Sequence, residues 1–438
     1  MLNIVCKPHR TYLKAETDEP QKLFVMMRLL PDKAISHARP PLALALVIDT
    51  SDSMRAHANH KTKLDYALDS AHQLIDDPHL EEKDCITLIQ FDDESNVVLP
   101  LSTLKDRVYA HQMVEVIRNY SGATFMGKGL NNALIQLSQE GTQVAKRVIL
   151  LTDGHTFDEA SCRNCMEKLA GTNAPIVSIG IGLEYNQDLL MELANHTKGY
   201  HLHLMEMNQL QNFFTAEIKT MVREVVTDLQ LKVAAVKGIT LETCSRVYPN
   251  LVEVSLEQQP LRLGNIAAGD YTVFILEFQI SDIFRPPSRA RLARVNLSGN
   301  IPSMQSKPGD FPQQEIFITF TKDDAQLALI DPEVLDYVQQ KNLDKLIYQA
   351  MNLTTKGDTE GARRTLQMAQ NITIKLQNTG ATQMLQGALE ELNKSGSMSA
   401  NTMRTVRAAG RTMTIKSSRT AFMDAKLSDE EIRKITGI

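Results

Sequence analysis

The sequence contains no tryptophan, and aromatic residues make up only 5% of its 438 positions. Proteins that hold single-stranded nucleic acid usually stack its bases on aromatic side chains, and this sequence offers few of them. The formal net charge of −5 also argues against general binding to a phosphate backbone. We therefore expect a protein that does not bind nucleic acid.

Long apolar runs are also missing. No run approaches the roughly 20 residues that a helix needs to cross a bilayer. The first ten residues lack the basic-then-apolar order of a secretory signal. The five cysteines form no disulfide-like spacing, which is typical of a reducing compartment. These absences predict a cytoplasmic protein without a membrane span.

The most informative stretch is the apolar run 42–48, which leads directly into Asp49, Ser51 and Ser53. Seven consecutive apolar residues predict a strand buried on both faces, as in a parallel sheet. In such sheets, ligands bind beyond the carboxyl ends of the strands. One carboxylate and two hydroxyls suit a hard divalent cation. On this stretch alone, a buried strand followed by an ordinary serine-rich turn is an equally good interpretation.

Two further loops with oxygen-bearing side chains favour a cation site over an ordinary turn. A second apolar run, 148–151, ends at Asp153 and Gly154, and Thr124 closes a glycine-containing turn before a helical pattern. These three loops, in this order, resemble the metal-ion-dependent adhesion site of von Willebrand factor type A domains, and the resemblance covers roughly residues 39–215. It implies a bound Mg²⁺, with Mn²⁺ or Ca²⁺ as alternatives, and five metal ligands: Asp49, Ser51, Ser53, Thr124 and Asp153.

The rim of this site is expected to contact a partner. Asp52 stands where the family often has glycine, and its carboxylate adds negative charge beside the ion. Phe125 directly follows Thr124, and His155 lies two residues after Asp153, so we place both on the partner-binding rim with Asp52. A catalytic role for His155 is less favoured, because the sequence shows no nucleophile or second base to work with it.

The pattern from 42 to 204 alternates strands with helices, which predicts a doubly wound, mostly parallel sheet of the α/β class. A charged turn between two strands predicts a hairpin with one antiparallel edge strand. Strands are expected at 42–48, 84–91, 95–99, 146–152, 174–181 and 199–204. Helices are expected near 62–76, 104–119, 126–139, 158–170, 187–195 and 208–226.

The flanking segments return to a two-residue period. We predict that they pair in one all-β sandwich, so that the α/β domain is an insertion whose ends lie close together. The resemblance extends to this layout, which is similar to bacterial type A proteins and inter-α-trypsin-inhibitor-like chains. Strands are expected at 2–5, 23–26, 229–236, 271–280, 289–297 and 315–320.

A helical pattern then follows, with Asp331-Pro332 as its start signal. This region is interpreted either as a docking surface or as a cap on the sandwich. The last segment is basic, and we weigh a solvated tail against a strand that adds to a sheet edge and supports self-association. The expected division is 1–38, first part of the sandwich; 39–226, type A domain; 227–322, second part of the sandwich; 323–400, helical domain; and 401–438, basic tail.

Several other residues are weighed and set aside. Cys162 and Cys165 form a lone Cys-x-x-Cys, and without a second pair they are interpreted as ordinary helix cysteines. Four histidines are given low weight: His57 and His60 as candidates to line the metal face, and His201 and His203 as surface or packed residues.

The function predicted is that of an adaptor, a non-enzymatic module that binds an acidic residue of a partner protein through the bound cation. One alternative is a metal-dependent hydrolase of the phosphatase or esterase type, in which the ion activates its water. It is less favoured because the sequence lacks a second metal cluster and a convincing general base. A structural subunit with a vestigial site is the third interpretation.

Overall fold

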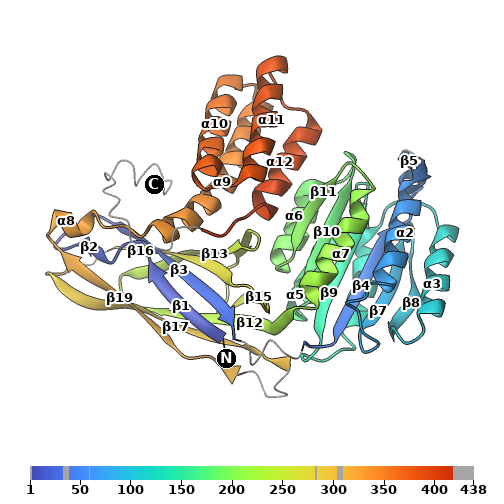
Figure 1. Cartoon of the computed structure of the whole chain (residues 1–438), viewed down its shortest axis with the longest axis horizontal. Helices are drawn as coiled ribbons and strands as arrows, with labels where there is room; N and C mark the ends of the chain where they lie inside the picture. The colour runs from blue at the N-terminus through green and yellow to red at the C-terminus, as the bar shows by residue number, and fades with distance from the viewer. Residues whose placement is uncertain (1, 33–38, 59, 282–283, 303–308, 418–438) are drawn as a thin grey trace.

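The computed structural model describes residues 2–32, 39–58, 60–281, 284–302 and 309–417. It has three parts (Figure 1). An α/β part lies on one side, strands fill the other side, and a group of long helices stands above the junction between them.

The α/β part is built on a six-stranded sheet in the order β11-β10-β9-β4-β7-β8. All neighbouring strands are parallel except β7 and β8, which form the predicted antiparallel edge pair. The doubly wound α/β fold predicted from the sequence is therefore confirmed. Its strands are β4 (Leu42–Asp49), β7 (Cys85–Phe91), β8 (Ser95–Thr103), β9 (Ala145–Thr152), β10 (Ile176–Ile181) and β11 (Tyr200–Leu204).

Two hydrophobic cores explain why β4 is apolar at every position from 42 to 48. Leu44 and Leu46 face the core that contains α2, α3 and α7, whereas Ala45 and Val47 face the core that contains α4, α5 and α6. Gly129 lets α4 approach closely, since a Cβ there would lie 2.9 Å from Val47 Cγ1. The helices are α2 (Lys63–Ile75), α3 (Arg107–Val116), α4 (Met126–Leu137), α5 (Glu159–Gly171), α6 (Gln187–His196) and α7 (Gln209–Met221), with short elements η1 (Asp52–Arg55), β5 (His57–Ala58), β6 (Lys61–Thr62) and η2 (Ile117–Asn119).

One boundary in this part was predicted wrongly. The helix expected at 208–226 ends at Met221, and a strand begins at Glu224. Val225 and Val226 are buried in the core of the neighbouring sheets. Packing in that core therefore outweighs the helical pattern of the sequence at these two residues.

The remaining strands form two mainly antiparallel sheets, in the orders β1-β3-β16-β13-β14 and β15-β12-β17-β19-β2. Buried residues from both sheets make one hydrophobic core. Strands that precede the α/β part in the sequence pair with strands that follow it, as β3 does with β16. The bounds are β1 (Leu2–Pro8), β2 (Tyr12–Lys14), β3 (Gln21–Pro31), β12 (Glu224–Ala235), β13 (Ile239–Tyr248), β14 (Val252–Val254), β15 (Leu261–Ala267), β16 (Thr272–Ile280), β17 (Ser288–Asn300), β18 (Gly309–Asp310) and β19 (Gln314–Thr321).

The sequence analysis did not predict β13, β14 and β15. The pairing of β13 with β16 is interrupted by two register shifts, and the pairing of β15 with β12 is also irregular. A bulge moves the following side chains to the other face, so the two-residue period is lost from the sequence pattern.

The C-terminal part contains α8 (Asp324–Leu327), α9 (Pro332–Thr355), α10 (Thr359–Lys375), α11 (Thr379–Ser395) and α12 (Ala400–Thr412). Asp331 caps α9 by accepting a hydrogen bond from the Val334 backbone N–H at 3.1 Å, with Pro332 at the first helical position as predicted. The first half of α9 packs Tyr337 and Val338 onto the β3–β16 sheet, and the four long helices share a separate core.

The prediction of a basic tail that begins at residue 401 was wrong for residues 401–412, because these residues belong to α12. Val406 is buried in the core of the helical part, and Ala408 and Ala409 are also buried. Met413 and Ile415, for which an added strand was the alternative to a solvated tail, lie outside any strand. The rest of the predicted tail, 418–438, lies outside the described residues.

None of the helices in the described part of the chain has the length and apolar character needed to span a bilayer.

Candidate metal centre

The carboxyl ends of β4 and β9 bring two buried carboxylates to the same edge of the sheet. Asp49 is the last residue of β4, and its Oδ1 accepts a hydrogen bond from the Ser51 backbone N–H at 2.8 Å. Its Oδ2 accepts one from the Thr152 hydroxyl at 2.6 Å. Asp153 follows Thr152 directly. Both carboxylates are fully buried, so neither is hydrated by bulk water.

Hydroxyl groups connect the two carboxylates. The short helix η1 turns the chain back after Ser51, so that Ser51 Oγ and Ser53 Oγ lie 3.1 Å apart. The Ser53 hydroxyl donates to Asp153 Oδ1 at 2.6 Å. Ser51 is buried and Ser53 is exposed, so this hydrogen-bonded network leads from the core to the protein surface.

Thr124 lies beside this network, in the loop before α4. A Cβ added at Gly154 would lie 3.4 Å from Thr124 Oγ1 and 3.8 Å from Ser53 Oγ, so the missing side chain leaves space between these two hydroxyls. Backbone hydrogen bonds fix the loops to one another: Asp52 N–H donates to Gly122 O at 3.0 Å, and Phe157 N–H donates to Thr124 O at 3.0 Å. All five predicted ligands therefore lie in one place.

The electrostatics of the centre favour a bound cation. Burial raises the pKa of Asp49 to about 6; hydrogen bonds from Ser51 and Thr152 oppose this, and the charge of Asp153 adds to it. Lys63, the first residue of α2, places its Nζ 2.5 Å from Asp153 Oδ2. One ammonium thus faces two buried carboxylates, and Asp49 has no positive partner among the contacts of the described residues.

The donor set fits a hard divalent cation. Two carboxylates and three hydroxyls are the oxygen ligands that Mg²⁺, Mn²⁺ and Ca²⁺ accept. Within the described ranges, no three imidazole, thiol or carboxylate groups are arranged to hold a metal. A cation here would therefore depend on the hydroxyls of Ser51, Ser53 and Thr124, and it would have to displace Lys63 from Asp153.

The three residues predicted for the partner-binding rim differ in exposure. Asp52 and His155 are exposed, and Phe125 is half-buried. Phe157, which the sequence analysis did not single out, is 75% exposed, and its ring centroid lies 5.6 Å from that of Phe125. The aromatic pair Phe125–Phe157 therefore forms an apolar patch beside the network.

Lys63 and Thr152 were also missed. Thr152 could have been found from its place beside Asp153. Lys63 could not, because the length and hairpin of the loop before α2 decide where its side chain returns.

The histidines and cysteines that were given low weight have ordinary structural environments. His57 and His60 are exposed near the β5–β6 hairpin. The Cys162 and Cys165 thiols are free and buried in α5, as predicted, and burial raises the pKa of both. His201 is buried with Ser178 and Tyr185, whereas His203 is half-buried and bonds to Asn401 of α12.

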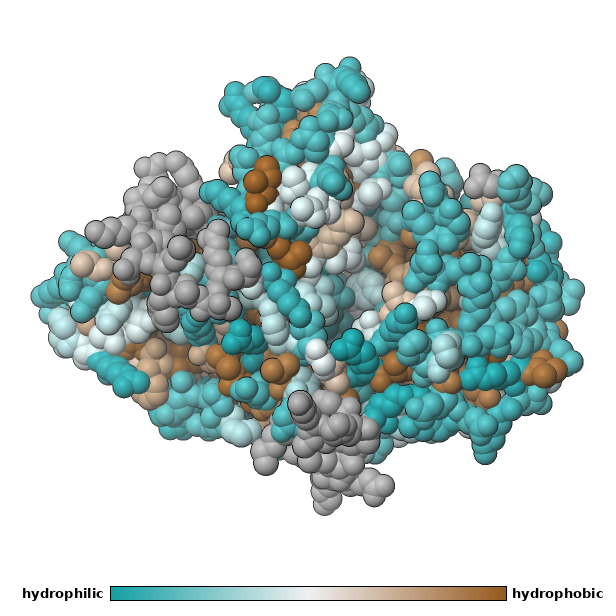
Figure 2. Space-filling view, in the orientation of Figure 1, coloured by the Kyte–Doolittle hydropathy of each residue, from teal (hydrophilic) through white to brown (hydrophobic). Residues whose placement is uncertain are grey.

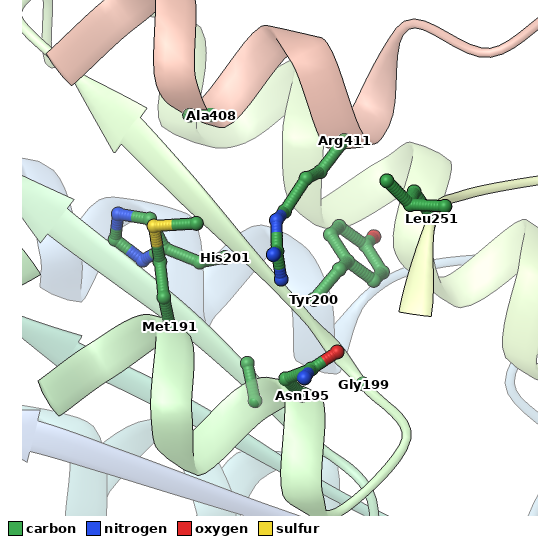
Figure 3. Close-up of a pocket in the computed structure, with 9 residues that line it drawn as sticks. Met191, Asn195, Gly199, Tyr200, His201, Leu251, Ala408 and Arg411 are labelled. Carbon is green, nitrogen blue, oxygen red and sulfur yellow. The ribbon is translucent and has the colours of Figure 1, made fainter. Parts of the chain in front are cut away.

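A small hollow, separate from the candidate metal centre, lies at the junction of the three parts (Figure 3). Tyr200 and His201 of β11 line it from the α/β part, Leu251 from the strands, and Arg411 points into it from α12. Arg411 donates two hydrogen bonds to Asp344 of α9, so its charge is already balanced. We interpret this hollow as a packing seam.

Comparison with known proteins identifies the class. Residues 43–216 match the family model of the von Willebrand factor type A domain, so the α/β part is a type A domain, a class that commonly binds protein partners. Residues 332–416 match the model described as Sll0103-like, C-terminal alpha-helical domain. No curated protein matches the chain.

Two solved structures have a similar fold over nearly the whole chain. A von Willebrand factor type A protein from Catenulispora acidiphila is 18% identical with a TM-score of 0.80, covering 94% of this chain and 97% of its own. The ArnB paralog VWA2 from Sulfolobus acidocaldarius is 17% identical with a TM-score of 0.62, covering 95% of this chain and 99% of its own. At these identities the likeness shows the fold alone.

Proposed function

We propose that the protein is an adaptor that binds an acidic side chain of a partner protein through a divalent cation at an intact metal-ion-dependent adhesion site. The observation that carries the proposal is the network of hydroxyls between two buried carboxylates, Asp49 and Asp153. A buried pair of like charges is costly without a cation, and the network ends at an exposed hydroxyl where a partner can reach it.

Each side chain has a definable role in this proposal. Asp49 and Asp153 supply charge, and the hydroxyls of Ser51, Ser53 and Thr124 supply neutral oxygens. Such a set leaves the cation with positive charge and a coordination position that a partner carboxylate can take. Thr152 orients Asp49 through its 2.6 Å hydrogen bond. The exposed carboxylate of Asp52 disfavours partners that carry additional negative charge near the contact.

The surface is consistent with a contact that depends on charge. On the face shown in Figure 2, the α/β part is covered mainly by hydrophilic residues. A small apolar contribution would come from the Phe125–Phe157 pair. In this proposal the remaining strands form a split β-sandwich that carries the inserted type A domain, and the free cysteines suit a reducing, cytoplasmic location.

The proposal is tested by titrating Mg²⁺ or Mn²⁺ into the whole protein by isothermal calorimetry. We expect saturable binding in the wild type and none in Asp49→Ala, with circular dichroism showing that the variant is folded. Asp52→Asn is the matched control, because it removes an exposed carboxylate from the same loop. This variant should keep metal binding. Absence of binding in the wild type would instead favour a vestigial site.

Partner binding is then measured by affinity capture from cells, with and without a chelator. We expect proteins that bind the wild type in Mg²⁺, and that are lost both with chelator and with Asp49→Ala. A partner that binds Asp49→Ala as well as the wild type, in chelator as in magnesium, would contradict the proposal.

A further inference from the structure

Two histidines on the surface of the type A domain face each other between α2 and α3. His72 Nδ1 and His111 Nδ1 lie 2.7 Å apart, and the rings are stacked with centroids 5.0 Å apart. Each side chain is 28% exposed. The pair is therefore open to solvent, in contrast with the buried carboxylates of the candidate metal centre.

The outer nitrogens of both rings contact carboxylates. His72 Nε2 lies 2.8 Å from Glu115 Oε1, and His111 Nε2 lies 2.9 Å from Asp76 Oδ1. The arrangement is reciprocal, because α2 and its C-cap provide His72 and Asp76, while α3 provides His111 and Glu115. Each histidine contacts the carboxylate that belongs to the other helix.

The Glu115 carboxylate also contacts a guanidinium group. Arg118 Nε donates a hydrogen bond to Glu115 Oε2 at 2.6 Å. An ionised carboxylate can only accept hydrogen bonds. His72 Nε2 and His111 Nε2 therefore each carry the hydrogen of their contact with a carboxylate.

A count of hydrogens then shows what the pair lacks. A neutral imidazole carries one N–H, so two neutral rings supply two hydrogens. The two carboxylate contacts use both of them. The Nδ1 atoms of His72 and His111 are then left with lone pairs that face each other across 2.7 Å, which is repulsive unless a positively charged species is shared between them.

We propose that His72 and His111 are the two protein ligands of a second cation site, which takes Zn²⁺ or another transition ion that prefers imidazole, such as Cu²⁺ or Ni²⁺. Metal-binding histidines usually donate their other ring N–H to a carboxylate, as both rings do here. Water would complete the coordination. Two nitrogens on one tetrahedral zinc stand about 3.3 Å apart, so the half-exposed rings separate slightly when the ion binds.

The donor atoms of the His72–His111 site disfavour Mg²⁺, the ion proposed for the Asp49 centre. Nitrogen ligands favour Zn²⁺, Cu²⁺ and Ni²⁺, whereas Mg²⁺ prefers oxygen. The bound ion would join α2 to α3, and α2 begins at Lys63, whose ammonium contacts Asp153. The site does not depend on the proposed function, because none of its four residues belongs to the hydroxyl network.

The test is calorimetric titration of Zn²⁺ into the whole protein in the presence of saturating Mg²⁺. We expect one zinc ion per chain in the wild type and in Asp49→Ala, and loss of this binding in His72→Ala and in His111→Ala. The Asp76→Asn and Glu115→Gln variants should bind zinc roughly 10–100-fold more weakly, since each removes the carboxylate that orients one ring.

His79→Ala is the matched control. His79 is exposed in the same domain and also contacts a carboxylate, with its Nδ1 2.8 Å from Asp77 Oδ1, but no second imidazole faces it in the described chain. This variant should keep the zinc ion. Absence of zinc binding in the wild type would overturn the proposal and leave a shared proton as the species between the rings. Zinc binding that survives both His72→Ala and His111→Ala would also overturn it.

Discussion

The two candidate cation sites of this domain differ in how the fold produces them. The Asp49 centre lies at the carboxyl edge of a parallel sheet, where three loops converge, and it offers oxygen atoms around buried charge. The His72–His111 pair lies on two neighbouring helices and offers two nitrogen atoms near the surface. Sheet topology brings together the residues of the first site, whereas the relative placement of two helices brings together those of the second.

The largest expected effect is a crossed loss of binding. Asp49→Ala should abolish Mg²⁺ binding and leave Zn²⁺ binding intact, whereas His72→Ala should do the reverse, because oxygen and imidazole nitrogen ligands select different ions. Calorimetry with both ions on both variants measures this. The comparison fails if either variant loses both ions while circular dichroism still shows a folded protein.

A second prediction concerns Lys63, whose ammonium contacts a candidate ligand of the Asp49 centre. Lys63→Met should lower the thermal stability of the metal-free protein by leaving Asp153 buried without its partner, a loss of up to roughly 3–5 kcal/mol. Added Mg²⁺ should then raise the melting temperature more than it does in the wild type, because the ion no longer competes with an ammonium.

The matched control for this prediction is Lys61→Met. Lys61 is two residues away, is 52% exposed in its side chain, and pairs with Asp69 at 2.6 Å on the surface. It should leave both the stability and the magnesium response close to those of the wild type. An unchanged magnesium response in Lys63→Met would show that the ammonium does not compete for the site.

A third prediction concerns pH. Burial raises the pKa of Asp49 from its ordinary value of 3.8 to about 6 in the folded, metal-free protein. Between these values the native state binds more protons than the unfolded state, so the stability of the metal-free protein should fall as pH rises from about 4 to about 6. The expected contribution is at most roughly 3 kcal/mol.

Chemical denaturation in chelator at several pH values measures this dependence. Asp49→Asn should remove the slope that Asp49 contributes, because the amide does not titrate. With saturating Mg²⁺ the wild type should instead lose stability as pH falls, since protons compete with the ion for its carboxylates. A slope that is the same in Asp49→Asn and in the wild type would contradict the assignment.

The smallest effect on the protein itself is expected for Phe157→Ala. This exposed side chain should contribute within about 0.5 kcal/mol to stability and nothing to magnesium affinity. Capture of the metal-dependent partner should nevertheless weaken, because the Phe125–Phe157 patch lies on the rim. Ile135→Ala, which is 51% exposed on α4, is the control, and equal capture by both variants would remove Phe157 from the rim.

The sequence predicted more of the oxygen centre than of the rest of the molecule. The run 42–48 and the positions of Asp49, Thr124 and Asp153 can be read locally, because an apolar run fixes where a buried strand ends and parallel strands end at the same edge. Their proximity was correctly predicted, and the binding of a metal stays a prediction. Strand β13 was missed because its bulges break the two-residue pattern.

By itself, the sequence determined the α/β class, the order of the loops and the kind of ligand atoms they bring, since these follow from hydrophobic period and residue type. Only the tertiary structure decided that Lys63 reaches Asp153, that α12 packs into the molecule where a tail was expected, and that His72 faces His111. These contacts join segments whose separation is set by loop lengths and helix packing, and no local pattern records where two such segments meet.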